Sequence, residues 1–286
     1  MVASVSPVIS VIIPTFNRRD VVGRAVQSVL DQEMGQFELI VVDDGSDDGT
    51  VGYLSTIDDS RLTVISQENA GVCVSRNVGV AASSARFVTF LDSDDEACPG
   101  WLDYYAEAIL NGIQLASCGM HFVGPGGLNK LVLPEHGGRP FGDLHTRFLA
   151  GAFGLEKELF NEVGGFRPGL RFSENTDLGL RLGGRMLEQP FSSGWTDEPL
   201  VTVHRDGEGY DPLVQYESSM TLLREDVEHL RRSRQLHATY LGIAGVAAGQ
   251  LGNRPESRRL LGQAIRVNPL GTKNYLRLGR EVVRRR

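Results

Sequence analysis

The sequence predicts an α/β protein in which a mostly parallel, nucleotide-binding sheet is flanked by helices and followed by a C-terminal helical extension. Short apolar runs rich in Val and Ile alternate with segments of helical periodicity through the first hundred residues, a pattern typical of strands covered on both faces. Acidic residues directly follow two of these runs. After about residue 205 the apolar residues recur at helical spacing alone. We therefore expect a sheet domain over residues 1–205 and a helical region over 206–286.

Length and composition place the chain among ordinary globular proteins. Its 286 residues are 41% hydrophobic and 23% charged, which allows a sizeable core. The first residues lack a basic, apolar leader, and no run approaches the roughly eighteen apolar residues of a membrane span, so a cytoplasmic location is expected. Cys73, Cys98 and Cys118 are too scattered for a disulfide framework or a thiolate metal site.

Charge is distributed unevenly along the chain. The net charge is −7, but residues 224–286 contain thirteen Arg, one Lys and five acidic residues, about +9, which leaves about −16 for the rest. The acidic body argues against nucleic acid as a partner and favours phosphates bound through a metal. The basic segment is interpreted either as a solvated helical face or as a peripheral contact with an anionic membrane or a phosphorylated acceptor.

The first predicted strand, residues 8–13, ends at Pro14. Apolar residues then recur at helical spacing, and Asn17, three residues before Asp20, is expected to cap this helix. A second strand at 37–42 completes a right-handed βαβ unit. The unit is not of the dinucleotide-binding type, because the first strand is not followed by a G-x-G-x-x-G loop.

Acidic turns follow the second and fourth predicted strands. Residues 43–50 form a Gly- and Asp-rich surface loop, and Asp92, Asp94 and Asp95 follow the strand at 87–91. The carboxyl ends of strands are where open α/β sheets bind ligands. Carboxylates one residue apart can both face a hard divalent cation. The alternative interpretation is an Asp-rich cap for the next helix.

The later part of the chain is less patterned. Two Gly-rich stretches, residues 124–127 and 135–140, are expected to be loops. In the helical region a break at 249–255 separates two helices, and the pair over residues 240–267 resembles one degenerate tetratricopeptide-like hairpin. We expect this hairpin to pack against the sheet domain.

Four stretches carry a resemblance to a known family. They are SVIIPTFNR at 10–18, VVDDGSDDGT at 41–50, NAGVCVSRN at 69–77 and FLDSDD at 90–95. In this order they resemble the signatures of the family 2 glycosyltransferases with the GT-A fold, and a looser match at 158–166 and 174–182 extends the resemblance to about residue 205. It implies transfer, with inversion, of a sugar from a UDP- or dTDP-sugar to a glycan, lipid-linked or secondary-metabolite acceptor, with Mn²⁺ or Mg²⁺ as cofactor.

The resemblance also implies a set of nucleotide-binding residues. Asp44 would accept a hydrogen bond from the imide N–H of the base, which favours uracil or thymine over cytosine. Arg76 would reach toward the base and phosphates, although a salt bridge on the helix surface is the alternative. Asp92 would bind the ribose. The whole set is Pro14, Thr15, Phe16, Asn17, Asp44, Arg76 and Asp92.

Asp94, Asp95 and His204 are the candidate metal ligands. A divalent cation is expected because release of a nucleoside diphosphate develops charge that a Lewis acid stabilises. Asp94 and Asp95 are implied by the resemblance, and His204 ends the last predicted strand. The alternative for His204 is a structural role.

Glu174, Asn175 and Asp177 are the candidate catalytic residues. Inverting transfer requires a carboxylate that accepts the acceptor's hydroxyl proton, and the family places an Asp where this chain has Asn175. Either Glu174 or Asp177 serves instead, the acceptor needs little deprotonation, or transfer is lost. Asp177 has an alternative role as an ion pair with Arg181, four residues further on the same helix.

Two other functions remain as alternatives. A nucleotide-sugar binding protein without turnover would explain Asn175. A sugar nucleotidyltransferase shares the sheet, but it normally begins with a Gly-rich loop followed by basic residues, and Pro14 to Asn17 do not fit that pattern.

Overall fold

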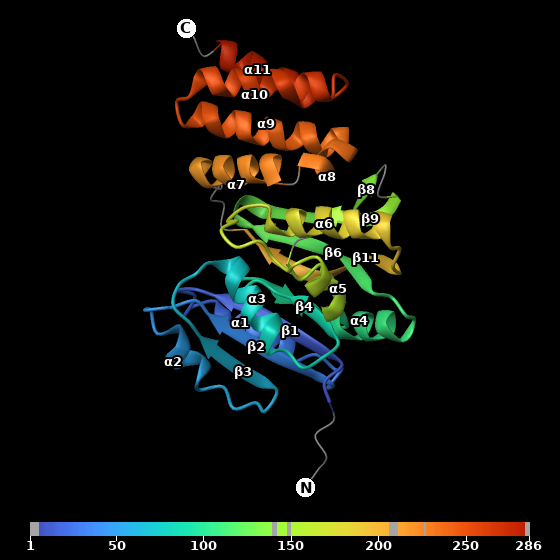
Figure 1. The fold of residues 1–286 in the computed structure, drawn as a ribbon. Coiled ribbons are helices and arrows are strands. Elements are labelled where there is room, and N and C mark those ends of the chain that lie inside the picture. The colour runs from blue at the N-terminus through green and yellow to red at the C-terminus, as the bar shows by residue number, and fades with distance from the viewer. Residues whose placement is uncertain (1–5, 139–141, 148–149, 206–210, 226, 284–286) are drawn as a thin grey trace.

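The computed structural model describes residues 6–138, 142–147, 150–205, 211–225 and 227–283 (Figure 1). The strands are β1 (Ile9–Thr15), β2 (Phe37–Asp43), β3 (Leu62–Ser66), β4 (Phe87–Phe90), β5 (Glu96–Ala97), β6 (Leu115–Gly124), β7 (Leu128–Val132), β8 (Glu135–Gly138), β9 (Gly142–Arg147), β10 (Phe153–Glu156) and β11 (Ser193–His204). The helices are α1 (Val22–Leu30), α2 (Thr50–Leu54), α3 (Val72–Ala82), α4 (Trp101–Leu110), α5 (Lys157–Glu162), α6 (Glu174–Glu188), α7 (Pro212–Glu225), α8 (Val227–Arg232), α9 (Arg234–Gln250), α10 (Arg254–Val267) and α11 (Thr272–Val283).

The main sheet has the strand order β3-β2-β1-β4-β10-β6-β11-β5, with β7 paired to β6. The four strands predicted from the apolar runs are parallel neighbours, which confirms the α/β fold. The antiparallel β10 joins them to β6 and β11, which are parallel to each other. Because β1, β2 and β4 run in the same direction, the polar turns that follow them lie at one edge.

The expectation of a loop at residues 135–140 was wrong in part. Glu135–Gly138 forms β8, which pairs antiparallel with β9 in a separate two-stranded sheet, while residues 139 and 140 lie outside the described part. Glycines weaken strand propensity, but pairing with a partner strand satisfies the backbone polar groups all the same. The other Gly-rich stretch is a connection, as predicted, because Pro125–Gly127 forms a short 3₁₀ turn between β6 and β7.

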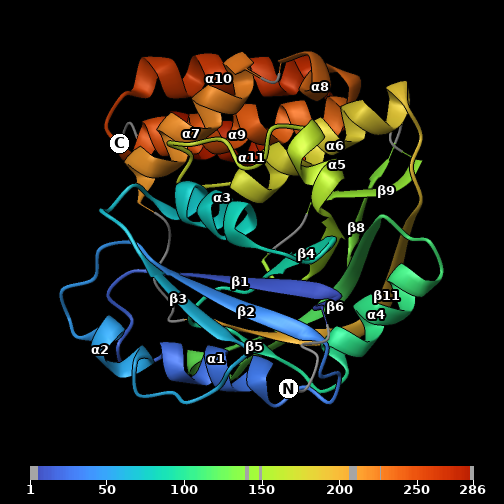
Figure 2. The same cartoon turned by 60° about the horizontal axis from the view of Figure 1, so that its bottom comes forward.

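Side chains of the central strand alternate between two apolar cores. Ile9, Val11 and Ile13 of β1 belong to a cluster with α1 and α4, whereas Ile12 belongs to a second cluster with α3, α5 and α6. This follows from the two-residue period of a strand. Figure 2 shows α1 on one face of the sheet and α3 on the other. Helices therefore cover both faces, as the continuous apolar runs predicted.

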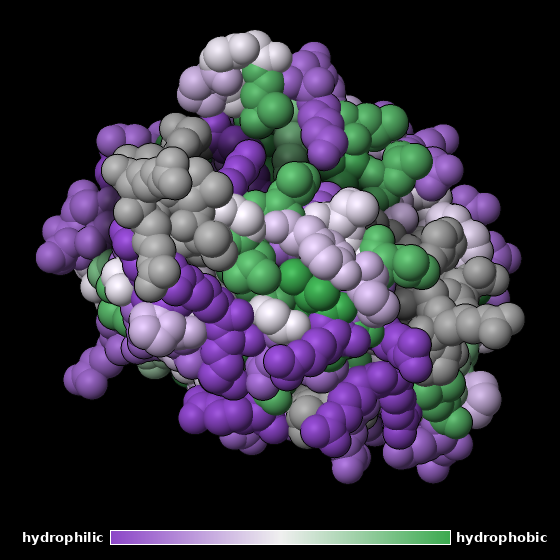
Figure 3. Space-filling view, turned by 90° about the horizontal axis from the view of Figure 1, so that it is seen from above, coloured by the Kyte–Doolittle hydropathy of each residue, from purple (hydrophilic) through white to green (hydrophobic). Residues whose placement is uncertain are grey.

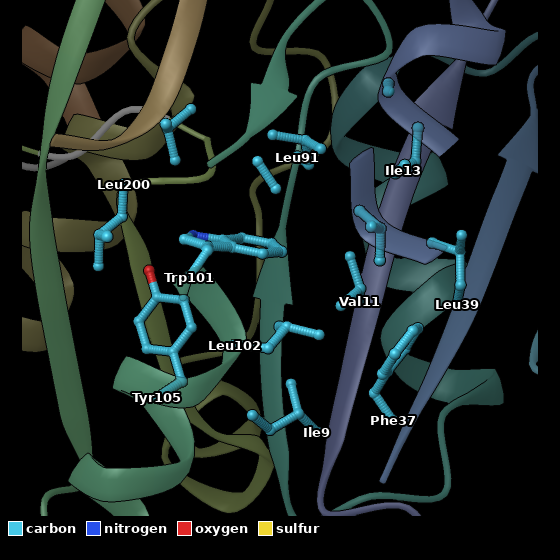
Figure 4. Packing of buried hydrophobic residues seen from close by; sticks show 14 of the residues in the cluster. Ile9, Val11, Ile13, Phe37, Leu39, Leu91, Trp101, Leu102, Tyr105 and Leu200 are labelled. Atoms are coloured by element: carbon cyan, nitrogen blue, oxygen red, sulfur yellow. The ribbon is translucent and has the colours of Figure 1, made fainter. Parts of the chain in front are cut away.

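Trp101 anchors the first core close to the acidic turn after β4. Its ring lies among Val11, Leu91 and Leu200 (Figure 4), and its Nε1–H donates to the carbonyl of Gly151 at 2.7 Å. The Tyr105 hydroxyl donates to the same carbonyl at 3.1 Å. Both buried polar groups are therefore satisfied, and α4 is tied to the segment before β10.

The C-terminal helices stack in the order α7, α9, α10 and α11 beyond α6 (Figure 1). Leu222 of α7 and Tyr240 of α9 belong to the same apolar cluster as Phe90 of the sheet, so this stack is packed onto the second core. α9 and α10 form the predicted helix hairpin, and Asn253 caps α10 by accepting a hydrogen bond from the Glu256 N–H. The predicted domain boundary falls at residues 206–210, outside the described part of the chain.

In the ranges that the structure describes, no helix combines the length and apolar character needed to cross a bilayer.

Candidate active site

The loop after β1 is tied to the loop after β2. Thr15 and Asp43 end these neighbouring strands in register. Asn17 adopts a positive φ of 52°, donates its N–H to the Ser46 hydroxyl at 2.8 Å and accepts the Asp47 N–H at 2.9 Å. The expectation that Asn17 caps the first helix was wrong, because α1 begins later, after Val21. An Asn side chain tolerates the left-handed region and bonds local backbone, and here it joins the two loops.

Asp44 is bound by the start of α3. One carboxylate oxygen accepts from the Ala70 N–H at 2.9 Å and from Gln67 Nε2 at 2.7 Å, and the other accepts from the Gly71 N–H at 2.8 Å. Burial raises the pKa of Asp44, but these hydrogen bonds outweigh it and hold the pKa below its usual value. The Ser75 hydroxyl is a further hydrogen-bond partner that lowers this pKa, so the side chain stays charged and its four or so acceptor positions are surrounded by donors.

Two buried oxygens beside Asp44 have no hydrogen-bond partner among the described residues. They are Thr15 Oγ1 and Asp43 Oδ1, although the second Asp43 oxygen accepts the Ser46 N–H at 3.1 Å. Leaving such a group unsatisfied costs about 1–3 kcal/mol. Thr15 lines a pocket, so a polar atom of a ligand there would remove that penalty.

Arg76 is a buried cation that connects three elements. Its guanidinium donates to Asp92 at 2.7 Å and to Glu174 at 3.1 Å and lies over the Phe166 ring, 5.0 Å from its centroid. Burial lowers the pKa of Arg76, but the two carboxylates outweigh it and raise the pKa above its usual range. The alternative of a salt bridge is therefore observed, and because the side chain is almost inaccessible that salt bridge is internal.

The acidic turn after β4 brings three carboxylates close together. Burial, followed by the charges of Asp92 and Asp94, raises the pKa of Asp95 to about 8. Asp94 is 3.8 Å from the guanidinium of Arg18. Mutual repulsion among carboxylates is what a bound divalent cation relieves, so the donor set of this turn suits such an ion.

His204 and Asp95 are not placed to bind a cation in the pocket. His204 Nε2 lies 2.6 Å from Glu96 Oε1, and the His204 N–H donates to Asp95 at 2.9 Å. Neither residue lines the pocket, so Asp94 is the single pocket-lining member of the predicted ligand set. Within the described ranges no group of three or more His, Cys, Asp or Glu is arranged to hold a metal by itself. One or two carboxylates completed by substrate phosphates form a normal Mg²⁺ environment, and this turn fits that case.

The three catalytic candidates at the start of α6 are placed differently. Glu174 lines the pocket. Asn175 is nearly buried, outside the lining, and its Oδ1 has no hydrogen-bond partner among the described residues. Asp177 is 0% exposed and forms ion pairs with Arg167 and Arg181, the second of which the spacing predicted. The turn of about 100° between successive helix residues separates Asn175 from Glu174, whereas Asp177 shares the face of Glu174 and is kept from the pocket by its two internal ion pairs.

A pocket of about 350 Å³ lies at the carboxyl ends of β1, β2 and β4. Its walls are Pro14, Thr15, Phe16, Arg18, Asp44, Val72, Ser75, Arg76, Asp92, Ser93, Asp94, Arg171 and Glu174. Phe16 is 46% exposed and presents an apolar ring at the mouth. The sequence singled out eight of these residues. It missed Arg171, for which no local pattern exists, and it included Asn17, which supports the loop from outside the pocket.

The parallel sheet and its acidic, nucleotide-sized pocket define a GT-A type of protein. Residues 10–175 match the family model described as Glycosyl transferase family 2. The chain belongs to this family.

Sequence relatives cover part of the chain. It is 40% identical over 121 residues, 41% of this chain, to the putative teichuronic acid biosynthesis glycosyltransferase TuaG of Bacillus subtilis, of which the match spans 46%. It is 39% identical over 100 residues to the GalNAc(5)-diNAcBac-PP-undecaprenol beta-1,3-glucosyltransferase of Campylobacter jejuni, which covers 34% of this chain and 32% of that protein. The chain therefore spans less than half the length of these relatives.

Among solved structures, that of S. aureus TarS 1–349 in complex with UDP-GlcNAc superposes with a TM-score of 0.66. The superposition covers 91% of this chain and 81% of that one at 22% identity. This similarity confirms the GT-A fold.

Proposed function

We propose that this chain is a glycosyltransferase that takes a sugar from a UDP- or dTDP-sugar and joins it to an acceptor in polysaccharide biosynthesis. The observation that carries the proposal is the convergence of Asp44, Arg76, Asp92, Asp94 and Glu174 on one pocket. Two relatives, named for teichuronic acid biosynthesis and for glucosyl transfer, support this proposal. The UDP-GlcNAc bound by TarS supports a uridine nucleotide as donor.

The base is expected to lie against Phe16 with its imide N–H directed at Asp44. Asp44 stays ionised, and the Ser75 hydroxyl beside it can donate instead to the Gly71 carbonyl at 3.2 Å. That leaves an acceptor position of Asp44 for the base, so it selects a base that donates there. Uracil and thymine do so, whereas cytosine presents an acceptor at that position. The Thr15 hydroxyl would take a polar atom of the nucleotide.

Asp94, with Asp92 beside it in the pocket wall, would hold Mn²⁺ or Mg²⁺. The cation would supply Lewis-acid stabilisation to the departing diphosphate. Arg76 fixes the Asp92 carboxylate from within the protein, and Arg18 lies next to Asp94 at the pocket wall. Both guanidiniums add positive charge where the phosphates would lie.

Glu174 is the proposed base. As the acceptor oxygen forms its bond to the anomeric carbon, the bond from that carbon to the phosphate oxygen breaks and its electron pair leaves with the nucleoside diphosphate. The hydroxyl proton passes to the Glu174 carboxylate. Attack opposite the leaving group inverts the configuration. Arg76 orients the same carboxylate through its 3.1 Å contact, so Glu174 is held in one place before the substrates bind.

The nucleotide preference gives a direct test of this function. Calorimetry with Mn²⁺ should show that UDP binds at least about tenfold more tightly than CDP, because one charge-assisted hydrogen bond is worth about 1.5–3 kcal/mol. Addition of a chelator should weaken UDP binding strongly. Equal affinities for UDP and CDP would contradict the assignment of Asp44.

A nucleotide-sugar binding protein without turnover is the second candidate. The observation that favours it is that Glu174 is already engaged by Arg76, while Asn175 occupies the position where the family has an Asp. Release of sugar from the donor in the presence of Mn²⁺, to water or to an acceptor, separates the two functions, because a binding protein releases none.

We also propose a peripheral contact between α11 and an anionic membrane. Leu270 is 91% exposed and Leu276 68% exposed, and Lys273, Arg277 and Arg280 lie on the same segment. Figure 3 views the molecule from this end and shows apolar side chains exposed among hydrophilic ones. Apolar side chains beside cations are typical of helices that lie on a lipid surface.

Sedimentation with vesicles should test this contact. The protein is expected to bind anionic vesicles at low salt and to be released at high salt, because charge attraction is screened within about 10 Å at 0.1 M. Leu276→Glu should weaken binding, whereas Leu251→Glu, at another exposed leucine, should not. The absence of binding at low salt would leave α11 as a solvated helix.

A further inference from the structure

We infer that a second pocket, built by α7, α9 and α10 with Arg231 of α8, binds the phosphate and the first part of the apolar chain of a lipid-linked acceptor. This inference rests on the proposed transfer and specifies its acceptor. The pocket has a volume of about 440 Å³, within the range of small-molecule sites. We call it the arginine pocket, because Arg224, Arg231, Arg259 and Arg266 line it.

The helical period brings the lining together. Met220, Leu223 and Arg224 are spaced by three and four residues and share one face of α7. His237 and Leu241 share a face of α9 in the same way. Residues 259, 263, 266 and 267 line the pocket from α10. Three helix faces therefore converge on one hollow in the stack.

The floor of the arginine pocket is apolar. Leu241 and Leu260 are buried members of the small core between these helices, and Met220, Leu223 and Val267 pack against them while also lining the pocket. A cluster of arginines that is only solvated does not require apolar residues beneath it. Contact between this apolar lining and water is unfavourable, whereas contact with a hydrocarbon chain is favourable.

The rim carries positive charge that the described residues do not neutralise. Arg259 is paired with Glu256 at 2.6 Å. Arg224, Arg231 and Arg266 form no ion pair within the described ranges, and the Arg224 hydrogen bonds go to Met220 and Thr221 of its own helix. Burial and then the charge of Arg231 lower the pKa of His237, and both side chains line the pocket. Guanidinium groups bind phosphate oxygens through paired hydrogen bonds.

A third hollow of about 490 Å³ shares lining residues with both the arginine pocket and the candidate active site. Arg171 lines both this hollow and the active-site pocket. Met220 and Arg224 line both this hollow and the arginine pocket. The three hollows therefore follow one another along the surface across α7. An acceptor whose sugar hydroxyl lies at Glu174 can extend along them with its phosphate among the arginines.

This combination selects one class of ligand. Inorganic phosphate would meet the arginines but leave the floor uncovered, and an uncharged glycan would contact neither feature well. An alkyl or isoprenyl phosphate or diphosphate satisfies both. We therefore expect the carrier end of the acceptor, an apolar chain on a phosphate, to occupy the arginine pocket.

Calorimetric titration with dodecyl phosphate, below its micelle concentration and without donor, tests the inference. The double variant Arg231→Ala/Arg266→Ala should bind it at least about tenfold more weakly, because each charged hydrogen bond contributes about 1.5–3 kcal/mol. The matched control is Arg232→Ala/Arg254→Ala. It removes two exposed arginines from the same two helices, α8 and α10, that do not line the pocket. It should leave the affinity for dodecyl phosphate unchanged. Gln263→Trp, which fills the hollow without altering charge, should also weaken binding.

Other modes of binding would give different results in these titrations. Dodecanol and inorganic phosphate should each bind more weakly than dodecyl phosphate. Equal loss in the control double variant would overturn the inference in favour of general charge attraction. UDP titration of the same variants, expected to be unaltered, tests donor binding separately. If the unmodified chain binds dodecyl phosphate but not UDP, the donor assignment fails and the arginine pocket stands.

Discussion

Glu174→Gln is expected to lower the release of sugar from the donor by about 10²- to 10⁴-fold, the usual contribution of a positioned general base. Glutamine keeps the length and hydrogen-bonding shape of the side chain but cannot accept the acceptor's proton. Turnover should be measured at saturating donor, with Mn²⁺ and with UDP affinity determined in parallel. Because Arg76 keeps its 2.7 Å contact with Asp92, UDP affinity is expected to change little.

The matched control is Asp177→Asn, on the same helix. Asp177 is paired with Arg167 and Arg181 inside the protein, so its loss should lower the free energy of unfolding, by about 3–5 kcal/mol for a broken buried pair, and leave turnover per folded molecule unchanged. If Glu174→Gln is silent, or if it impairs UDP binding and stability while turnover of the folded protein persists, Glu174 is a positioning residue for Arg76 and the base lies elsewhere.

Asp94→Ala is expected to weaken UDP binding in Mn²⁺ by more than about 100-fold, because a divalent cation contributes several kcal/mol when it bridges phosphates. The variant should also bind UDP equally with Mn²⁺ and with a chelator. Calorimetry under both conditions measures the two effects together. The control is Asp103→Ala, an exposed carboxylate on α4.

Two outcomes would contradict the metal role of Asp94. The first is equal UDP affinity of the unmodified chain with Mn²⁺ and with chelator. The second is a variant that loses affinity but keeps its metal dependence, which would move the ligand to Asp92. In that case Asp94 acts through its neighbour Arg18, 3.8 Å away.

Local sequence determined the first half of the sheet and most of the residues that line the candidate site. The apolar runs at β1, β2, β3 and β4 predicted parallel strands because their residues suit a surface buried on both faces. Since parallel strands end at one edge, the positions of Asp44 and Asp92 after two of those strands were enough to place both at the pocket. Arg76 was found by its motif, although its motif did not say that it is buried.

Tertiary structure decided the roles at the start of α6. Glu174 meets Arg76 across 98 residues of chain, and no pattern within α6 states which of Glu174, Asn175 and Asp177 faces the pocket. That choice depends on how the helix packs against α3 and the loop before it. Arg167 pairs with Asp177 from that loop, and no sequence pattern around Arg167 predicts this pairing.

Local sequence likewise does not state which groups surround His204 or the arginines of the basic segment. A histidine at a strand end is compatible with a metal ligand or an ion pair, and the 2.6 Å contact with Glu96 of β5 is a product of sheet pairing between β5 and β11. The sequence by itself determined that positive charge accumulates after residue 224. Only the packing of α7, α8, α9 and α10 decided that Arg224, Arg231 and Arg266 surround an apolar hollow, because charge is a property of composition, whereas a pocket depends on which helix faces meet.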